Sequence, residues 1–298
     1  MAFRSGFATL VGRPNVGKSS LVNRLVGANV AIISPRPQTT RAAVRAIRHT
    51  PTSQLVLVDT PGLHRPRTLL GERTNARAEA ALGDVDVVGL VVAAGEAVGP
   101  GDRHVADLVR GVATRRVLVV NKADTVRPAQ ADTQRASAED RLGPFAASVV
   151  CSARTGEGID ALAAALEAAL PEGPAYYPEG VVTDETDTVL AAELVREQLL
   201  QIARDELPHS IAVTVEELDP DPAHPARDVL RLLVDVHVER PSQRPIVLGR
   251  GGATLKAAVT AARLELEARL GRPVFLQTRV RVERNWQRRP HALDRLGL

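Results

Sequence analysis

The sequence predicts an α/β domain, with a mostly parallel sheet and helices on both faces, followed by a smaller α+β domain. Between residues 7 and 170, short β-branched apolar runs alternate with stretches of helical spacing, as is typical of buried strands joined through helices. Residues 171–180, rich in Pro and Gly, interrupt both patterns. Beyond them the order is helix, strand, strand, helix, helix, strand. These three observations indicate two packed units joined by a linker.

The elements of the first part follow from short runs. Apolar runs bounded by Gly, Asp, Asn or Ser predict its parallel strands: Phe7–Val11, Leu55–Val58, Val85–Val92, Val117–Val120 and Val149–Cys151. Helical spacing predicts the helices between them: Lys18–Leu25, Glu72–Leu82, Asp102–Arg110, Ala129–Leu142 and Ile159–Leu170. Ala42–His49 is expected to pair antiparallel with Leu55–Val58 through the turn at residues 50–53. Ligands of such a sheet bind at the carboxyl ends of its strands.

The second part is predicted in the same way. Its elements are a helix near Asp187–Leu207, strands near Ile211–Leu218 and Val229–Glu239, a short apolar element at Pro245–Leu248, a Gly-rich turn at Gly249–Gly252, a helix at Thr254–Leu270 and a strand at Val274–Val282. The predicted domains are residues 1–172 and 183–298, with the linker at 173–182. Each is large enough to bury its own core.

Composition excludes several classes of protein. Hydrophobic residues are 44% of the 298 and charged residues 24%, which is typical of a folded globular chain. No apolar run approaches the ~20 residues that span a bilayer, and the first residues lack the layout of a signal peptide, so a cytoplasmic location is expected. The single cysteine, Cys151, excludes an internal disulfide and a cysteine-based metal site. Aromatic residues, at 2%, are too few for a base-stacking sheet.

Charge is unevenly distributed along the chain. Residues 241–298 carry 12 basic and 4 acidic side chains, whereas residues 178–240 carry 5 and 15. The basic end is therefore the expected surface for a polyanion. Of 38 basic residues only three are lysines, Lys18, Lys122 and Lys256, and each falls in one of the motifs described next.

A phosphate-binding loop occupies Gly12–Ser19, between a predicted strand and a predicted helix. Backbone N–H groups of such a loop wrap phosphates at a helix N-terminus, which carries positive partial charge. Lys18 is expected to reach the β- and γ-phosphates, and Ser19 to bind Mg²⁺. The expected nucleotide contacts are Gly12, Asn15, Val16, Gly17, Lys18, Ser19 and Ser20.

Three further motifs follow other predicted strands. Asp59–Gly62 suits a carboxylate that holds Mg²⁺ through water and a Gly62 N–H that contacts the γ-phosphate. The motif Asn121–Asp124, which includes Lys122, places the carboxylate of Asp124 where it accepts hydrogen bonds from guanine N1–H and from the 2-amino group. Adenine has neither donor on that edge, so the motif selects GTP. Ser152, Ala153 and Arg154 supply a backbone N–H for guanine O6.

These motifs resemble the G1, G3, G4 and G5 motifs of a GTPase, and the whole chain resembles the Era-type GTPases. Residues 34–41 are similar to the first switch of that family. The resemblance implies that a switch threonine binds Mg²⁺; Thr40 is favoured and Thr39 is the alternative. It also implies catalysis by Lys18, Thr40, Asp59 and Gly62, with a metal set of Ser19, Thr40 and Asp59.

Two residues bear on the rate of hydrolysis. Leu63 stands where Ras-like enzymes carry the glutamine that orients water, so intrinsic hydrolysis is expected to be slow. Asn15 resembles an asparagine that binds K⁺ in potassium-activated relatives, and a loop-shaping hydrogen bond is its other interpretation. Arg36, Arg41 and Arg65 are alternative sources of positive charge.

The second part carries a Gly-x-x-Gly turn, Gly249–Gly252, between apolar residues and a helix. Such a turn lets a sugar-phosphate backbone approach closely. The turn, its order of elements and the local positive charge resemble the type II KH domain of the Era-type family. The expected RNA contacts are Ile246, Gly249, Arg250, Gly251, Gly252, Lys256 and Trp286. For Trp286 a place in the core is the alternative to stacking on a base.

The resemblance implies a monomeric GTP-hydrolysing switch that binds the 3′ end of small-subunit ribosomal RNA and acts in assembly of the small ribosomal subunit. It also implies Mg²⁺, GTP or GDP as ligands, K⁺ as an optional activator, and weak peripheral contact with the inner face of the cell membrane. Two other functions stay open. One is a membrane-associated regulator of division, which needs a basic amphipathic helix that the Pro-interrupted tail, residues 288–296, does not provide. The other is an RNA chaperone that binds GTP without turnover.

Overall fold

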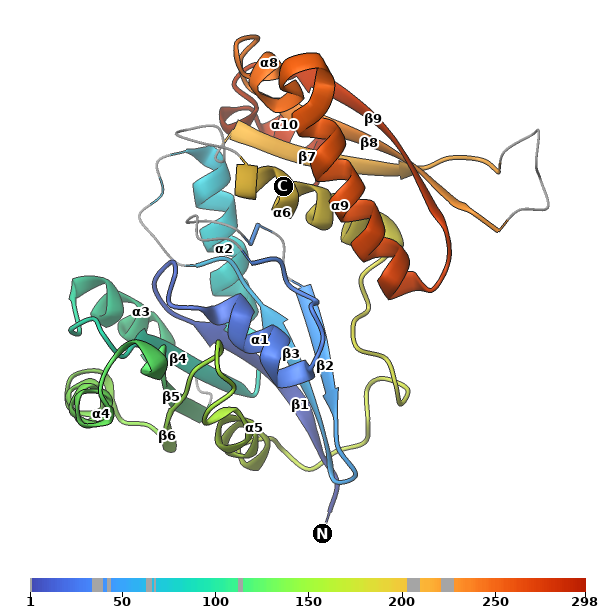
Figure 1. Cartoon of the computed structure of the whole chain (residues 1–298). Coiled ribbons are helices and arrows are strands. Elements are labelled where there is room, and N and C mark those ends of the chain that lie inside the picture. Colours follow the sequence, from blue (N-terminus) through green and yellow to red (C-terminus); the bar gives the residue numbers. More distant parts are fainter. Residues whose placement is uncertain are drawn as a thin grey trace. The chain divides into compact units, whose positions relative to one another are not determined.

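The computed structural model describes residues 2–33, 40–41, 44–62, 66, 68–111, 115–202, 210–220 and 228–298 (Figure 1). The chain divides into two compact units. The first comprises Met1–Arg67 and Gly71–Asp184, and the second Thr68–Leu70 and Glu185–Leu298. The predicted fold class, an α/β domain followed by an α+β domain, is confirmed.

The first unit is built on a six-stranded sheet in the order β2-β3-β1-β4-β5-β6. Its strands are β1 (Arg4–Val11), β2 (Val44–His49), β3 (Ser53–Asp59), β4 (Val87–Ala93), β5 (Arg115–Asn121) and β6 (Ala147–Val150). Its helices are α1 (Lys18–Val26), α2 (Leu69–Gly83), α3 (Pro100–Arg110), α4 (Pro128–Leu142) and α5 (Ile159–Ala168). Only β2 runs antiparallel, paired with β3 as expected.

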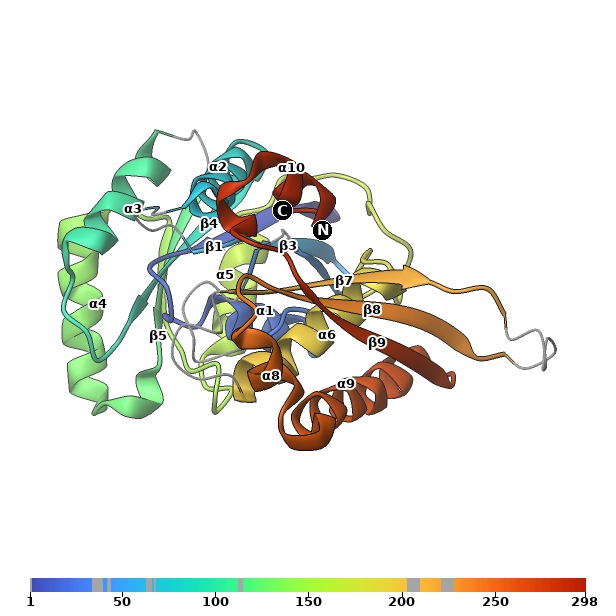
Figure 2. The same ribbon diagram turned by 90° about the horizontal axis from the view of Figure 1, so that it is seen from above.

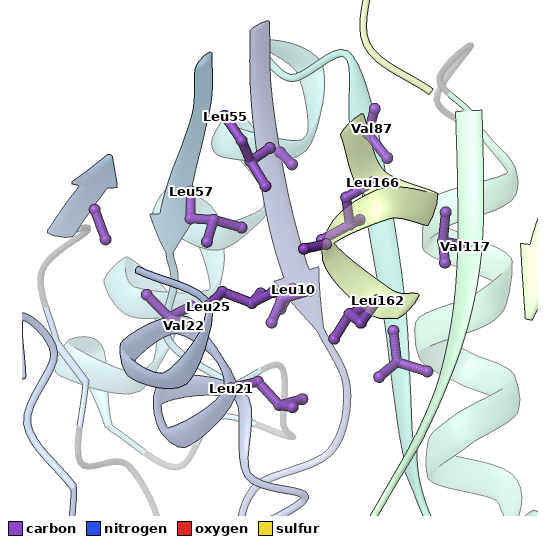
Figure 3. Packing of buried hydrophobic residues seen from close by; sticks show 14 of the residues in the cluster. Leu10, Leu21, Val22, Leu25, Leu55, Leu57, Val87, Val117, Leu162 and Leu166 are labelled. Atoms are coloured by element: carbon purple, nitrogen blue, oxygen red, sulfur yellow. The ribbon is translucent and has the colours of Figure 1, made fainter. Parts of the chain in front are cut away.

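Two apolar layers bury this sheet. On one face α1 and α5 direct Leu21, Leu25 and Leu162 onto the strands (Figure 3). On the other, α2, α3 and α4 pack against residues such as Leu90 and Leu118. Every residue of β4 is buried, which explains why its sequence is a continuous apolar run without alternation. Truncating a fully buried leucine of these layers to alanine costs about 2–5 kcal/mol of stability, so these layers stabilise the sheet that carries the strand-end loops.

The Pro/Gly-rich segment that the sequence marks as a linker lies along the edge of this sheet. The buried Gln54 side chain accepts from the Tyr176 and Tyr177 amides at 2.6 and 3.0 Å and donates to the Tyr177 carbonyl at 2.8 Å. Further on, the amide of Ile47 in β2 donates to the Val182 carbonyl at 2.9 Å. Pro and Gly disfavour a helix or a central strand, but their carbonyls still accept hydrogen bonds. The segment is therefore held on the first unit as far as Asp184.

The second unit follows the predicted order of elements, and a short helix that was not predicted, α10 (Pro290–Arg295), comes after them. The predicted elements are α6 (Asp187–Ile202), β7 (Ile211–Glu217), β8 (Leu230–Val238), α8 (Gln243–Leu248), α9 (Ala253–Leu270) and β9 (Val274–Val282). β7 pairs antiparallel with β8, and β8 pairs parallel with β9. α6 and α9 cover one face of this sheet (Figure 2). α9 does so with a stripe at helical spacing that includes Leu255, Ala258 and Leu266.

The tail packs against the unit to which it belongs. Ala292 and Leu293 of α10 are buried together with Trp286 and Ala212. The apolar side chains of the tail are thus used within the second unit. Over the described ranges, the structure contains no helix with both the length and the apolar character to cross a bilayer.

Candidate functional site

The predicted motifs of the first unit lie in loops that follow β1, β3, β5 and β6. These four strands are mutually parallel through the sheet, so their carboxyl ends share one edge. β1 and β4 are neighbours in the sheet, and the chain leaves them toward opposite sides: the connection after β1, through α1, leads to β2 and β3, whereas the connection after β4, through α3, leads to β5. Such a switch point opens a crevice for ligands in α/β folds.

The loop before α1 is tied to the loop after β5. Gly17 has φ +96°, and a Cβ there would lie 2.4 Å from Nδ2 of Asn121, so only glycine fits. That same Nδ2 donates to the Val16 carbonyl at 2.8 Å. Asn121 and Val16 are almost completely buried. Asn15, beside them, is exposed with φ +64°. The phosphate loop and the base loop are therefore fixed relative to each other.

Lys18 is a buried ammonium held by weak partners. Its side chain reaches back over the loop, and Nζ donates to the carbonyls of Gly12 and Arg13, each at 3.2 Å. Burial lowers the pKa of Lys18 to about 8, while the nearby carboxylate of Asp59 acts in the opposite direction. A Cβ on Gly62 would lie 3.1 Å from Nζ, so the Gly62 backbone runs directly beside it. The arrangement favours an incoming anion, because an anion would stabilise the buried charge of Lys18.

Three side-chain oxygens meet next to Lys18. Ser19 Oγ donates to Asp59 Oδ2 at 2.8 Å, and Thr40 Oγ1 donates to the same atom at 3.2 Å. The two hydroxyl oxygens are 3.2 Å apart. Asp59 is fully buried, and Thr40 is nearly so. Two hydroxyls and one carboxylate form the all-oxygen set that Mg²⁺ prefers, so these residues fit that ion. Thr39, the alternative to Thr40, lies outside the described residues.

The loop after β5, which is expected to bind the base, carries the hydrogen-bonded carboxylate of Asp124. Asp124 accepts from the Ser152 hydroxyl and from Arg154 Nε, the latter at 2.7 Å. The Ser152 hydrogen bond, followed by that of Arg154, holds the pKa of Asp124 below its usual value, although burial opposes the shift. The Ala153 amide donates to Asn121 Oδ1 at 3.1 Å. A cavity of about 650 Å³ opens beside these groups, and its lining includes Gly17, Ser20, Asn121, Lys122, Asp124 and Arg154.

Sequence reasoning missed seven of the residues that line this cavity: Asn23, Arg24, Gly27, Ala28, Asn29, Ile33 and Thr125. Among them, the side chain of Arg24 contacts the loop after β6. It extends from α1 and donates from Nε to the Ala153 carbonyl at 3.2 Å and from Nη2 to the Arg154 carbonyl at 3.0 Å. The signal that points to it is its spacing, because it follows Ser20 by four positions and therefore shares the helix face that lines the cavity. Four other predicted positions, Arg36, Thr39, Leu63 and Arg65, lie outside the described residues. Arg41 is buried.

In the second unit, the predicted Gly-x-x-Gly turn joins α8 to α9. Gly251 and Gly252 have φ +60° and +81°, and a Cβ on either would meet no atom within 4 Å. Arg250 and Lys256 are exposed beside them. Ile246, three residues before Gly249, is 57% exposed, whereas the next residue, Val247, is buried in the core. The turn is thus an open, positively charged helix start with an apolar side chain at its edge.

Trp286 requires a correction. The sequence slightly favours its stacking on RNA, but its side chain has no exposed surface. Its Nε1–H donates to the Ser210 carbonyl at 3.2 Å, and the ring packs with Leu293 and Leu296. A ring enclosed in this way offers no face to a base. The large apolar surface of a tryptophan favours burial in the core, and Trp286 is buried there.

Comparison with known proteins gives consistent matches. The family model described as "50S ribosome-binding GTPase" matches residues 7–122, and one described as "KH domain" matches residues 206–287. GTPase Era of Mycobacterium sp. (strain JLS) is 50% identical over 301 residues, with 99% of each chain covered. GTPase Era of Mycobacterium tuberculosis (strain ATCC 25177 / H37Ra) is 51% identical over 302 residues, again with 99% of each covered.

Two solved structures match over the same length. One is an Aquifex aeolicus Era variant bound to GDP·AlF4⁻, with TM-score 0.95, 34% identity and 99% of each chain covered. The other is Era in complex with MgGDPNP and nucleotides 1506–1542 of 16S ribosomal RNA, with TM-score 0.94, 35% identity and the same coverage.

Proposed function

Because the chain belongs to the Era family of GTPases, we propose that it is a GTP-hydrolysing switch that binds the 3′ end of small-subunit ribosomal RNA and acts in small-subunit assembly in the cytoplasm. One observation carries the catalytic part of this proposal. The Lys18 ammonium and the oxygens of Ser19, Thr40 and Asp59 converge at the carboxyl ends of β1 and β3. The RNA part rests on the open glycine turn and on the relative that was solved with 16S RNA.

Phosphate binding starts with Lys18. Its Nζ would exchange its two carbonyl partners for the β- and γ-phosphate oxygens. There it would stabilise the negative charge that develops on the leaving group during hydrolysis. The amides at the start of α1 bind the same phosphates. The Gly62 amide is assigned to the γ-phosphate, since the Gly62 backbone lies beside Nζ. These groups are in place before the substrate arrives, so little reorganisation opposes the reaction.

Ser19, Thr40 and Asp59 would hold Mg²⁺, with Asp59 acting through a water molecule. The ion would neutralise phosphate charge when it is bound. Both hydroxyls donate to Asp59 Oδ2, which leaves the lone pairs of their oxygens free for the ion. Thr40 belongs to the first switch, residues 34–41, so its hydroxyl would link the metal to the position of that switch. This geometry supports Thr40 as a ligand.

Guanine selection is assigned to Asp124. Its two carboxylate oxygens accept from N1–H and from the 2-amino group of the base, and Lys122 and Arg154 line the same cavity. Asn15 is exposed at the rim of the phosphate loop. Its side chain is therefore available either to a monovalent cation or to the loop itself, and equal hydrolysis rates in K⁺ and Na⁺ would favour the loop.

RNA binding is assigned to Ile246, Arg250, Lys256 and the glycines of the turn between α8 and α9. The space around Gly251 and Gly252 admits a sugar-phosphate backbone, and two cations flank it. Trp286 has no part in this proposal. Peripheral membrane binding is not proposed either, because the apolar residues of α10 are buried against their own unit. We assign a monomer as the working form.

Single-turnover hydrolysis tests the function directly. The purified protein is mixed with GTP or ATP, with and without Mg²⁺, in the presence and absence of a small-subunit 3′-end oligonucleotide. We expect Mg²⁺-dependent hydrolysis of GTP alone, and anisotropy of the labelled oligonucleotide should report binding. Binding of GTP and RNA without any turnover would support the RNA chaperone instead, and turnover of ATP at the GTP rate would overturn the assignment of the base site.

A further inference from the structure

The loop assigned to guanine O6, residues 152–157, is held by a residue that belongs to none of the nucleotide-binding motifs, Arg24. Residues 152–157 form a tight turn in which the Gly156 amide donates to the Ser152 carbonyl and the Ser152 amide donates to the Glu157 carbonyl, both at 2.9 Å. Arg24 holds this turn from α1 through the carbonyls of Ala153 and Arg154. A Cβ on Gly156 would lie 3.6–3.7 Å from three guanidinium atoms of Arg24, so the turn wraps closely around that group.

The planarity of the peptide bond gives this contact a direction. The Ala153 carbonyl and the Arg154 amide belong to one peptide unit and point to opposite sides of it. The Ala153 amide is already used by Asn121 Oδ1, at 3.1 Å. The amide of Arg154 is the next donor along the loop. A side chain that holds the Ala153 carbonyl therefore fixes the direction of the Arg154 N–H.

We propose that Arg24 is a positioning residue for guanine recognition, because it orients the 153–154 peptide so that the Arg154 N–H meets O6 of the base. Arg24 touches the loop and not the reacting phosphates. Its planar guanidinium supplies two donors at a fixed spacing, which suits two successive carbonyls. A lysine ammonium also has several donors, but they radiate from one nitrogen at the end of a flexible chain and lack the fixed spacing of the guanidinium. This proposal rests on the nucleotide site proposed above.

Loss of Arg24 is expected to affect recognition of O6 and not recognition of the 2-amino group. Asp124 reads N1–H and the 2-amino group and is held by Ser152 and Arg154 side chains. O6 recognition depends on the backbone that Arg24 holds. Removal of Arg24 is therefore expected to weaken contact with O6 while leaving discrimination at the 2-amino group unchanged.

Competition binding with Mg²⁺ tests this on the full chain, with GDP, 6-thio-GDP and IDP as probes. Sulfur at position 6 is a poor acceptor but leaves N1–H and the 2-amino group in place, and IDP lacks only the 2-amino group. For Arg24→Ala we expect about tenfold weaker GDP binding, a smaller loss for 6-thio-GDP, and an unchanged ratio of GDP to IDP affinity. Arg24→Lys should recover part of the loss.

Arg115→Ala is the matched control. Arg115 likewise donates from its guanidinium to a backbone carbonyl, that of Ala169 at 3.0 Å, beyond the end of α5 and outside the cavity lining. It should leave all three affinities unchanged. GDP binding by Arg24→Ala at full strength, or equal losses for GDP and 6-thio-GDP, would overturn the role of Arg24. Absence of GDP binding by the unmodified protein would instead overturn the nucleotide site itself.

Discussion

The two units each place a glycine-rich turn before a helix, and the two turns are built in opposite ways. In the first, before α1, the space beside Gly17 is filled by Asn121, and Lys18 is only 8% exposed. In the second, before α9, Thr254 fills the space beside the first glycine, Gly249, but the spaces beside Gly251 and Gly252 are empty. Lys256 and Arg250, the cations of that second turn, are exposed.

The difference reflects the ligand that each turn is proposed to bind. A nucleotide is small enough to be enclosed by a loop whose parts already hold one another in place. Each hydrogen bond and charge interaction with the enclosed ligand is then stronger, because the effective dielectric constant is low. An RNA strand enters from the side and continues past the protein, so its turn stays open and its cations stay hydrated. We therefore expect larger effects from substitutions in the first turn than in the second.

The largest expected effect follows from Lys18→Ala. The substitution removes the ammonium that opposes phosphate charge, and no other cation is expected to replace it within so closed a loop. Hydrolysis should fall by a factor on the order of 1,000. Single-turnover assays at saturating GTP measure it, and RNA anisotropy by the same variant should stay at the unmodified value. A modest loss would mean that the charge is supplied from elsewhere.

Asp124→Asn should reverse the base preference. An amide donates to the 2-oxo group of xanthine, whereas the carboxylate accepts from the 2-amino group of guanine. We expect GTP affinity to drop on the order of 100-fold and XTP affinity to rise, as measured by competition. Unchanged GTP affinity without any gain for XTP would disprove the assignment of Asp124.

Gly251→Asp should weaken binding of the 3′-end oligonucleotide by about tenfold because a carboxylate would face the phosphates. Gly271→Asp is its control. Gly271 ends α9 with φ +67° and open space around it, so the new side chain meets the same backbone strain. Anisotropy of both variants at several salt concentrations measures the effect, and equal losses would show that the loss does not depend on a carboxylate at position 251. GTP hydrolysis without RNA should be unchanged in both.

A smaller effect is expected from pH. Lys18 has a pKa near 8 without ligand, and phosphate raises it, so above pH 8 binding must take up a proton. Nucleotide affinity is therefore at its maximum when the pH is well below the pKa of Lys18 in the ligand-free protein, and it declines as the pH rises through that pKa. GDP affinity should fall by about fourfold between pH 7 and pH 8.5, a range in which guanine N1–H stays protonated. The slope should vanish in Lys18→Met; if it persists there, another group titrates.

The smallest effect on binding is expected from Trp286→Phe. A buried side chain that packs with α10 should contribute to stability alone, so RNA affinity should change less than about twofold. The free energy of unfolding should fall by about 1–3 kcal/mol. Thermal or urea unfolding and anisotropy on one preparation measure both quantities. Loss of RNA affinity in a variant of unchanged stability would restore the stacking role.

The candidate site was largely predictable because local sequence sets the ends of buried strands. Asp59 and Asn121 close β3 and β5, and Lys18 opens α1, within a residue or two of the predicted bounds. Sequence patterns did not predict the contact of Arg24, because it joins α1 to a loop about 130 positions away. They also placed a linker at residues 173–182, where hydrogen bonds from Gln54 and β2 hold the segment on the sheet.

By itself, then, the sequence determined the periodicity of the elements, the order of the two units and the chemistry of the motifs, because each depends on residues close together in the chain. The tertiary structure alone decided which side chains become enclosed. Trp286 and Ile246 are both apolar residues near the predicted RNA surface, yet one is fully buried and the other is 57% exposed. Burial depends on what the rest of the fold packs against a residue, here α10 over Trp286, and no local pattern encodes that partner.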